Sequence, residues 1–414
     1  MTLPLRPLFF WFHLATGLVA GLVVFTMAAT GVLLTYERQL VDRADASVSR
    51  VAAPATGRPL PVEEQVRRAL AERPEAVPTS LAIAADPRKA TVLSLGREGV
   101  LYVDPYSGRP TGEGSRGLRG FFRTVTEIHR FLGAEGDRRA IGRAATGAAN
   151  LAFLALVVTG LYLWVPRTLK RRQVRAVAWF RRGLSGKARH FNWHHTIGLW
   201  IAPPLLVIVA SGAVMSYDWA GALLYRMTGS ELPKESPRPG GPAGGPVGPG
   251  GSGRPGAERS PAFDPGSVAG LDPLFETARG QVAGWRTITL RLPKAEDESV
   301  SFSIARSHRG RPDLRDTLEL DRKSGAIVRW QPFSEQSAGR RARSWMRFLH
   351  TGEPGGLLGQ SVAGVASLGT LVMVWTGFAL AFRRFFSRRA SSPSTFPSAD
   401  SSPSPALPLR GDLS

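Results

Sequence analysis

The stretch Phe9–Thr35, "FFWFHLATGLVAGLVVFTMAATGVLLT", decides the fold of this chain. It carries no Lys, Arg, Asp or Glu, and a helix that rises about 1.5 Å per residue needs about 20 apolar residues to cross a hydrocarbon core of about 30 Å. One histidine, His13, lies near its start. Ionisable side chains are costly in membrane helices and tend to mark function, so His13 is a candidate functional residue.

The pattern around His13 occurs a second time, in Asn192–Ser216, "NWHHTIGLWIAPPLLVIVASGAVMS". Both stretches contain His-x-x-x-Gly-Leu, followed at the same distance by Thr-Gly or Ser-Gly. Three pairs of positions are related by a separation of 181 residues: His13 and His194, Gly17 and Gly198, and Gly31 and Gly212. This regularity predicts an internal duplication.

Four apolar runs are long enough to span a membrane. They are Leu8–Leu34, Ile141–Val165, Thr196–Tyr217 and Leu357–Phe382. The first exceeds the roughly 7–15 apolar residues of a cleaved signal peptide, so we expect it to remain as a helix. The second and fourth runs also match one another, at a separation of 217 residues: Gly142 and Gly359, Gly147 and Gly364, Thr159 and Thr376, and Gly160 and Gly377.

The composition of the chain limits which cofactors and partners it can bind. The chain has 414 residues, a formal net charge of +21 and no cysteine. The missing cysteines exclude disulfides, cysteine-ligated iron–sulfur clusters and c-type heme attachment. Nucleic-acid binding is disfavoured because the basic residues flank the apolar runs and no nucleic-acid motif is present.

The basic residues also predict the orientation in the membrane. The loop 166–190 holds nine Lys or Arg and no acidic residue, and four arginines follow the fourth apolar run. By the positive-inside rule these ends and the N-terminus are cytoplasmic. The long loops 37–139 and 218–356 then face outward.

Each outer loop contains a small α+β pattern. In the first, "LPVEEQVRRALAERP" predicts an amphipathic helix and "KATVLSLGREGVLYVDPYSGRPTG" predicts strands. In the second, "DPLFETARGQV" predicts a helix, and "RTITLRLP", "SVSFSIAR" and "DTLELDRKSGAIVRW" predict strands. The predicted fold class is therefore a membrane α-helical protein, a four-transmembrane-helix bundle with two periplasmic α+β domains.

The predicted boundaries follow from these patterns. Segments 8–35, 141–165, 194–218 and 357–382 are the membrane helices, 37–139 and 263–340 the outer domains, and 166–192 a basic cytoplasmic loop. We expect disorder in 232–262, which is rich in Pro and Gly, and in the Ser/Pro-rich cytoplasmic tail 388–414.

Four of the seven histidines occupy matching positions in the two halves. His13 and His194 start the first and third runs, whereas His129 and His350 precede the second and fourth on the outer side. A single histidine at a membrane interface is commonly only a half-solvated polar residue, but two matched pairs are harder to explain in that way. Neutral imidazole ligates heme iron, and histidines from two helices can bind one heme from both sides. The sequence thus predicts two b-type hemes.

The remaining candidates are weaker. His195 is the fallback ligand for His194, whereas His190 has no counterpart and His308 is expected to be a solvated turn residue. Gly17, Gly21, Gly142 and Gly147 could let helices or a flat macrocycle approach closely. Four outer arginines could pair with heme propionates or with an anionic substrate, although each could equally be solvated interfacial charge: Arg123, Arg130, Arg341 and Arg347.

At this point the chain resembles the PepSY-associated transmembrane family, also called iron-regulated membrane proteins, over residues 5–388. The residues that carry the resemblance are "FHLATGLVAG…ATG", "WHHTIGLW…SGA", "VDPYSGRPTG", "LHTGEPGGLLGQ" and "TGLYLWVPR". The resemblance implies that the outer domains are PepSY-like and that the protein has a role in iron uptake at the bacterial inner membrane. Some relatives are di-heme ferric-siderophore reductases. Others carry a fused flavodoxin-type reductase domain, which this chain lacks, so a separate cytoplasmic or quinone electron donor is implied.

Two function classes therefore remain. The first is an oxidoreductase in which electrons enter at a heme on His13 and His194, pass to one on His129 and His350, and reduce a periplasmic acceptor such as a ferric siderophore. No acid–base catalytic group is needed for this. The second is a heme-free membrane scaffold or transport partner whose PepSY domains restrain other proteins.

Overall fold

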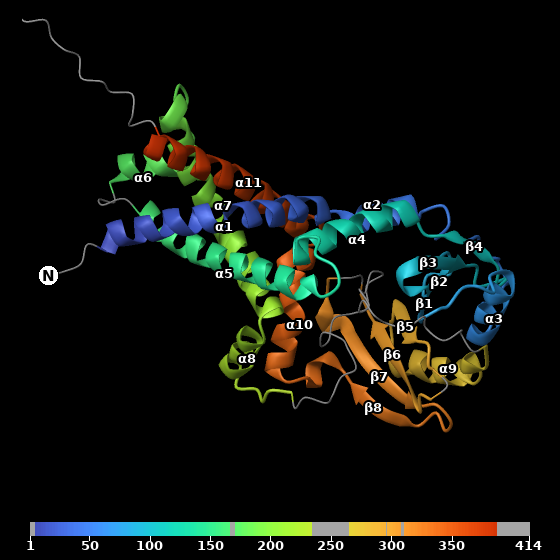
Figure 1. Ribbon diagram of the computed structural model, residues 1–414. Helices are drawn as coiled ribbons and strands as arrows, with labels where there is room; N and C mark the ends of the chain where they lie inside the picture. The colour runs from blue at the N-terminus through green and yellow to red at the C-terminus, as the bar shows by residue number, and fades with distance from the viewer. Residues whose placement is uncertain (1–4, 166–169, 234–264, 295, 308–309, 387–414) are drawn as a thin grey trace, which may run out of the picture.

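The computed structural model describes residues 5–165, 170–233, 265–294, 296–307 and 310–386. The expected linker 232–262 and tail 388–414, together with His308, fall wholly or mainly outside these residues. Four long helices lie side by side at one end of the molecule, and a β-sheet with two short helices lies at the other (Figure 1).

The four long helices confirm the predicted apolar runs. All four are long and apolar enough to cross a membrane: α1 (Leu5–Leu34), α5 (Arg138–Trp164), α7 (Gly186–Ser216) and α11 (Gly356–Phe386). Large apolar side chains such as Val19, Leu22 and Leu358 point outward and are 71–85% exposed. A surface of this kind is stable in lipid rather than in water, so the chain is a membrane protein.

The bundle has a regular arrangement. α1 packs against α5 and α11, and α7 packs against the same two helices. α1 and α7 therefore lie diagonally across the bundle, and so do α5 and α11. The duplication seen in the sequence is thus a pseudo-symmetric pairing of α1 with α7 and of α5 with α11.

Shorter helices extend from both ends of the bundle. They are α2 (Glu37–Ala44), α4 (Arg116–Phe131), α6 (Arg171–Ala178), α8 (Asp218–Met227) and α10 (Ala338–Thr351). α4 packs on α1 and α5, whereas α10 packs on α7 and α8. These two helices repeat one another in the two halves and lie on the side of the bundle that faces the sheet (Figure 1).

The sheet contains strands from both halves of the chain. Its antiparallel order is β4-β3-β2-β1-β5-β6-β7-β8. The first half supplies β1 (Ser80–Ala84), β2 (Thr91–Ser94), β3 (Val100–Val103) and β4 (Pro110–Glu113). The second half supplies β5 (Thr287–Arg291), β6 (Ser299–Ala305), β7 (Arg315–Asp321) and β8 (Ile327–Gln331).

The prediction of two separate outer domains is not confirmed. β1 pairs with β5 along its whole length, from Ser80 opposite Arg291 to Ala84 opposite Thr287. One apolar core continues across this junction and contains Leu81 and Leu93 from the first half together with Leu290 and Phe302 from the second. The outer region is therefore one sheet with one core, to which each half contributes four strands and one helix.

Helices α3 (Val62–Glu72) and α9 (Leu271–Gln281) cover one face of this sheet (Figure 1). The alternation of apolar and polar residues, as in the "SFSIA" segment of β6, turns Phe302 and Ile304 into the core and their neighbours outward. Burial of one apolar side chain stabilises such a core by roughly 1.5–3 kcal/mol.

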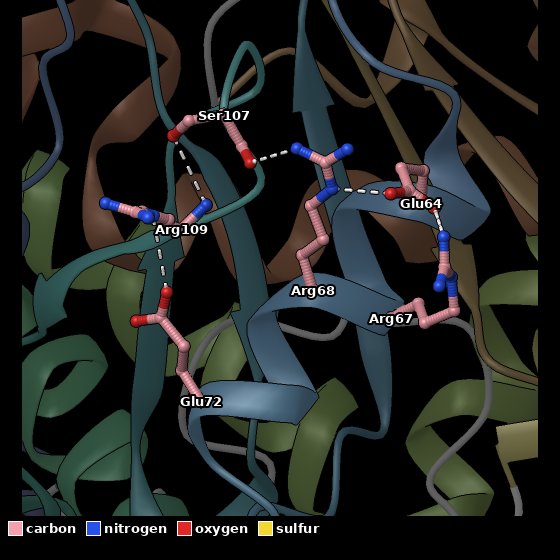
Figure 2. Close-up of polar contacts among 6 residues, drawn as sticks. All are labelled: Glu64, Arg67, Arg68, Glu72, Ser107 and Arg109. Atoms are coloured by element: carbon pink, nitrogen blue, oxygen red, sulfur yellow. Dashed lines mark hydrogen bonds and ion pairs between the residues drawn. The ribbon is translucent and has the colours of Figure 1, made fainter.

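Polar contacts fasten α3 to the turn between β3 and β4 (Figure 2). Arg68 donates to the carbonyl of Ser107 at 3.0 Å and also pairs with Glu64, while Arg109 pairs with Glu72 at 3.6 Å. Gly108 closes this turn at a φ of +75°, and a Cβ there would lie 2.7 Å from the Arg68 side chain. A glycine is therefore required both by the backbone conformation and by the close packing.

Candidate functional site: two histidine pairs

The structure brings four histidines together as two pairs. His13 of α1 faces His194 of α7 with ring centroids 6.4 Å apart and planes at 84°. His129 of α4 faces His350 of α10 with ring centroids 6.3 Å apart and planes at 72°. We call the first the far-side pair, since it lies at the end of the bundle away from the sheet, and the second the sheet-side pair.

The two pairs are well separated along the bundle. His129 contacts Thr30 of α1, and from His13 to Thr30 the helix rises about 26 Å at about 1.5 Å per residue. The pairs therefore lie near opposite faces of a bilayer about 30 Å thick.

In each histidine the Nδ1 atom is held by a hydrogen bond. The Nδ1 atoms of His13 and His194 contact the hydroxyls of Thr159 and Thr376 at 2.9 and 3.0 Å. In the sheet-side pair, His129 contacts the Thr30 hydroxyl at 2.9 Å. His350 contacts the carbonyl of Ile208 at 2.8 Å and, less closely, the Ser211 hydroxyl at 3.4 Å.

These contacts determine which ring nitrogen carries the proton. Each of the hydroxyls of Thr159, Thr376 and Thr30 lies 2.7–2.8 Å from the carbonyl four residues earlier in its own helix. A hydroxyl has one proton, so a hydroxyl that donates to a carbonyl must accept from the histidine. The carbonyl of Ile208 can only accept, and it imposes the same result on His350. Nδ1 is thus the protonated nitrogen, and the Nε2 lone pair is left for a ligand.

The spacing within each pair fits a shared metal. Two imidazoles that bind one iron from opposite sides, each at about 2 Å, place their ring centres roughly 6 Å apart. Metal-ligating histidines generally donate their other ring N–H to an oxygen acceptor, as Nδ1 does here. The residues present therefore fit a bis-histidine heme at each pair.

Glycines leave space beside the histidine rings. A Cβ at Gly160 would lie 3.2 Å from Cε1 of His13, and one at Gly377 would lie 3.6 Å from Cε1 of His194. Each of these glycines follows the threonine that holds the same histidine. The Thr-Gly dipeptide thus places two features at consecutive residues. The threonine hydroxyl accepts a hydrogen bond from the histidine, and the glycine leaves room for the histidine ring.

A small cleft of about 50 Å³ lies beside the far-side pair. It is lined by His13, His194 and His195 and by apolar side chains of α5, α7 and α11, among them Leu156, Leu205 and Met373. Its walls are mostly apolar, as expected for a site that accepts a flat, largely apolar macrocycle.

The sheet-side histidines are held in the neutral form. Burial lowers the pKa of His129 to about 4, and it also lowers the pKa of His350. A neutral imidazole is the form that binds iron.

A family model described as "PepSY-associated TM region" matches residues 10–384. The chain belongs to this family. No curated protein matches the chain significantly. Membership in the PepSY-associated family confirms the resemblance drawn from the sequence motifs, and those motifs contain His13, His194, His350 and the dipeptides Thr30-Gly31 and Thr159-Gly160.

The structure also places the weaker candidates in this PepSY-associated chain. His195 lines the cleft and packs on Phe191 at a ring distance of 4.2 Å, rather than facing His13 as His194 does. His190 packs on Trp375 in the bundle, with ring centroids 4.9 Å apart, and its Nδ1 finds no partner among the described residues.

The four glycines named from the sequence lie away from the histidines. Gly21 packs against Phe378, Gly147 against Tyr217, Gly17 against Leu156 and Gly142 against the carbonyl of Phe131. They serve the packing of helices and of the α4–α5 turn. The glycines that border the histidine rings are Gly31, Gly160 and Gly377.

The sequence did not predict two parts of the site: the hydroxyl groups that contact the histidines, and the helices α4 and α10. The Thr-Gly and Ser-Gly pairs were recognisable as repeats, but their side chains gave no sign of which histidine they would contact. The helices α4 and α10, which carry His129 and His350, were not predicted. Their signal is the amphipathic pattern of segments such as "RGLRGFFRTVTEIHRF".

Proposed function

We propose that this protein is a di-heme b-type electron-transfer protein of the bacterial inner membrane that acts as a ferric-siderophore reductase. The observation that supports this most directly is the equal geometry of two histidine pairs near opposite faces of one bundle. A scaffold would not need two such pairs with the same proton arrangement. A heme bound at each pair would supply a reversible one-electron carrier.

The residues of the chain have distinct tasks in this proposal. His13 and His194 would hold the far-side heme, and His129 and His350 would hold the sheet-side heme. Thr159, Thr376 and Thr30 keep the proton on Nδ1, so that Nε2 stays available. Apolar side chains of the bundle exclude water between the two sites, as at Val157, Leu205 and Ala366.

The direction of transfer rests on the charge distribution. The far-side end of the described chain carries many Lys and Arg, whereas Asp and Glu are absent from the described stretches of 138–217 and 356–386. By the positive-inside rule the far side is cytoplasmic, with both termini, and the sheet is periplasmic. Electrons from a separate cytoplasmic or quinol donor would then leave at the sheet-side pair.

The acceptor is a ferric chelate. One electron delivered to the chelate converts one Fe(III) to Fe(II), which hard oxygen ligands bind more weakly. Iron is then released and the chelator is left intact. The protein needs only to dock the chelate near the sheet-side pair, which agrees with the absence of any required acid–base step.

Heme stoichiometry on purified protein tests the first part of the proposal. Protein from heme-replete cells should contain about two hemes per chain, with low-spin bis-imidazole spectra. His195→Ala is the matched control, because its neighbour His194 is the proposed ligand; this variant should keep both hemes. A folded but colourless protein would leave the heme-free scaffold as the better explanation.

Proteoliposomes test the second part. With a membrane-impermeant reductant on the far side and a ferric siderophore on the sheet side, Fe(II) should appear with matching heme oxidation. If the hemes are oxidised by a quinone but by no ferric chelate, the acceptor is wrong and the direction of flow has to be reversed.

A further inference from the structure

Trp164, the last residue of α5, has a polar group that the packing of the chain leaves unused. Its side chain lines the cleft beside the far-side pair, together with His13 and His195. Its indole Nε1 is buried and has no hydrogen-bond partner among the described residues. A buried donor without an acceptor is unfavourable, so this N–H indicates a ligand that accepts a hydrogen bond at the cleft.

The position of Trp164 along the bundle relates it to the far-side histidines. Gly160 lies four residues earlier on α5, and a Cβ there would lie 3.2 Å from Cε1 of His13. Four residues of helix rise about 6 Å, and α5 runs from the sheet side to the far side. Trp164 therefore lies about one helical turn beyond the His13 ring, toward the far end of the bundle.

Arg6 brings positive charge to the same end of α5. Its Nη2 atom donates to the carbonyls of Leu163 at 2.9 Å and Val165 at 2.6 Å, the two residues on either side of Trp164. The helices α1, α5, α7 and α11 contain no Asp or Glu that could neutralise this guanidinium. A hydrogen-bond acceptor beside Trp164 is therefore favoured if it carries negative charge, as a carboxylate does.

The other half of the bundle has no equivalent of this indole. Gly160 corresponds to Gly377 at a separation of 217 residues, and the same separation leads from Trp164 to Ala381, which is buried. The space beside each histidine ring is thus repeated in the two halves, whereas the indole donor is not. The far-side site is polar at one edge only, next to the end of α5.

We propose that the indole N–H of Trp164 donates a hydrogen bond to a propionate carboxylate of the far-side heme, with Arg6 supplying the nearby positive charge. The inference deepens the proposed function and rests on it, since it requires a heme at His13 and His194. It directs the carboxylate edge of that heme toward the far end of the bundle. The arginines suggested by the sequence as propionate partners lie instead on α4 and α10, with the sheet-side pair: Arg123, Arg130, Arg341 and Arg347.

The test compares the binding of heme with that of heme dimethyl ester, in which both carboxylates are blocked. Full-length His129→Ala, made in heme-deficient cells, can take up either compound only at the far-side pair. This chain should bind heme about tenfold or more tighter than the ester, because a hydrogen bond to a charged group is lost in the ester. Adding Trp164→Phe, which keeps an aromatic ring but removes the N–H, should reduce the preference about tenfold. Titrations followed at the Soret band measure both affinities.

Trp200→Phe in the same background is the matched control. The indole Nε1 of Trp200 already donates to the carbonyl of Ala178 at 2.9 Å, and Trp200 is not among the described residues that line the cleft. This substitution also removes one indole N–H from the chain. The preference for heme over the ester should stay within about twofold of that of His129→Ala.

Three results would overturn the inference: equal affinity of His129→Ala for heme and ester, an unchanged preference after Trp164→Phe, or equal losses after Trp164→Phe and Trp200→Phe. If Trp164→Phe does not fold, ultraviolet resonance Raman spectra of His129→Ala decide instead. The heme-loaded chain should show one indole that is more strongly hydrogen-bonded than in the ester-loaded chain, and identical spectra would contradict the proposal. If neither compound binds, the di-heme function itself fails, whereas equal binding of both removes only the role of Trp164.

Discussion

The far-side and sheet-side pairs have the same ring spacing but are built differently. His13 and His194 belong to the membrane helices themselves, and their partners Thr159 and Thr376 lie on the adjacent helices α5 and α11. His129 and His350 belong to the short helices α4 and α10, and their partners lie on α1 and α7. The far-side pair therefore depends on the bundle alone, whereas the sheet-side pair also depends on how the outer region is attached.

The two pairs also differ in their symmetry. The far-side histidines both contact threonine hydroxyls, at almost equal distances. On the sheet side, His129 contacts a hydroxyl, but His350 is held chiefly by the backbone carbonyl of Ile208. A side-chain acceptor can be removed by mutation and a backbone acceptor cannot, so the two halves of the sheet-side pair should respond differently to substitution.

The largest expected effect is the loss of one heme when one ligand is removed. His13→Ala should reduce the content from about two hemes per chain to about one, and His129→Ala should do the same at the other pair. Since the pairs lie about 26 Å apart along α1, the remaining heme should keep its midpoint potential. Redox titration of each variant checks this, and a double loss in either variant would show that the pairs are not independent.

A smaller effect, confined to the sheet side, is expected from Asp45→Asn. The buried Asp45 carboxylate pairs with Arg119 and accepts hydrogen bonds from the Tyr102 hydroxyl at 3.0 Å and the Ser115 N–H at 2.7 Å, and it thereby fixes the start of α4. Removal of one partner from a buried ion pair costs about 3–5 kcal/mol. The sheet-side heme should therefore be lost first on heating.

Heme absorbance followed against temperature measures this loss. Asp42→Asn, on helix α2 just before Asp45, is the control, because its side chain is 70% exposed and its pair with Arg38 is at the surface. Equal loss of both hemes in Asp45→Asn would mean that the outer region supports the whole bundle.

The hydroxyl acceptors should differ between the two halves. Thr30→Val removes the hydroxyl that holds Nδ1 of His129, and it should weaken heme binding at the sheet-side pair about 10–100-fold. Ser211→Ala should have little effect, because the Ile208 carbonyl still holds Nδ1 of His350. Heme retention during dilution into apomyoglobin compares the two, and equal losses would contradict the assignment of the carbonyl as the main acceptor.

The smallest effect is expected at the far-side glycines. Gly160→Ala places a Cβ 3.2 Å from His13 and should cost about 1 kcal/mol through overpacking. Gly377→Ala places its Cβ at 3.6 Å from His194, an ordinary contact, and should be close to neutral. The added Cβ lies closer to the histidine ring in Gly160→Ala than in Gly377→Ala. We therefore expect a small shift of the midpoint potential of the far-side heme in Gly160→Ala alone.

Several elements could be predicted from the sequence because their signals are local. The apolar runs gave all four membrane helices, although α7 begins at Gly186, eight residues before the predicted boundary at 194, because its first turns are polar. The helices α3 and α9 and strands β2, β3 and β5–β8 follow their residue patterns. Strand β1, "SLAIA", was missed because its two alanines leave no clear alternation of apolar and polar side chains.

The sequence by itself determined the number of membrane helices, the duplication and the identity of four matched histidines, since each is a matter of periodicity or of repeated spacing along one chain. Only the tertiary structure decided which histidines face one another, which hydroxyl holds each Nδ1, and that β1 joins β5 to make one sheet. The hydrogen bonds that hold the histidines join residues from 99 positions apart, for Thr30 with His129, to 182 positions apart, for His194 with Thr376. The physical reason is that hydrogen bonds and ring contacts depend on positions in space, which no local pattern of residues encodes.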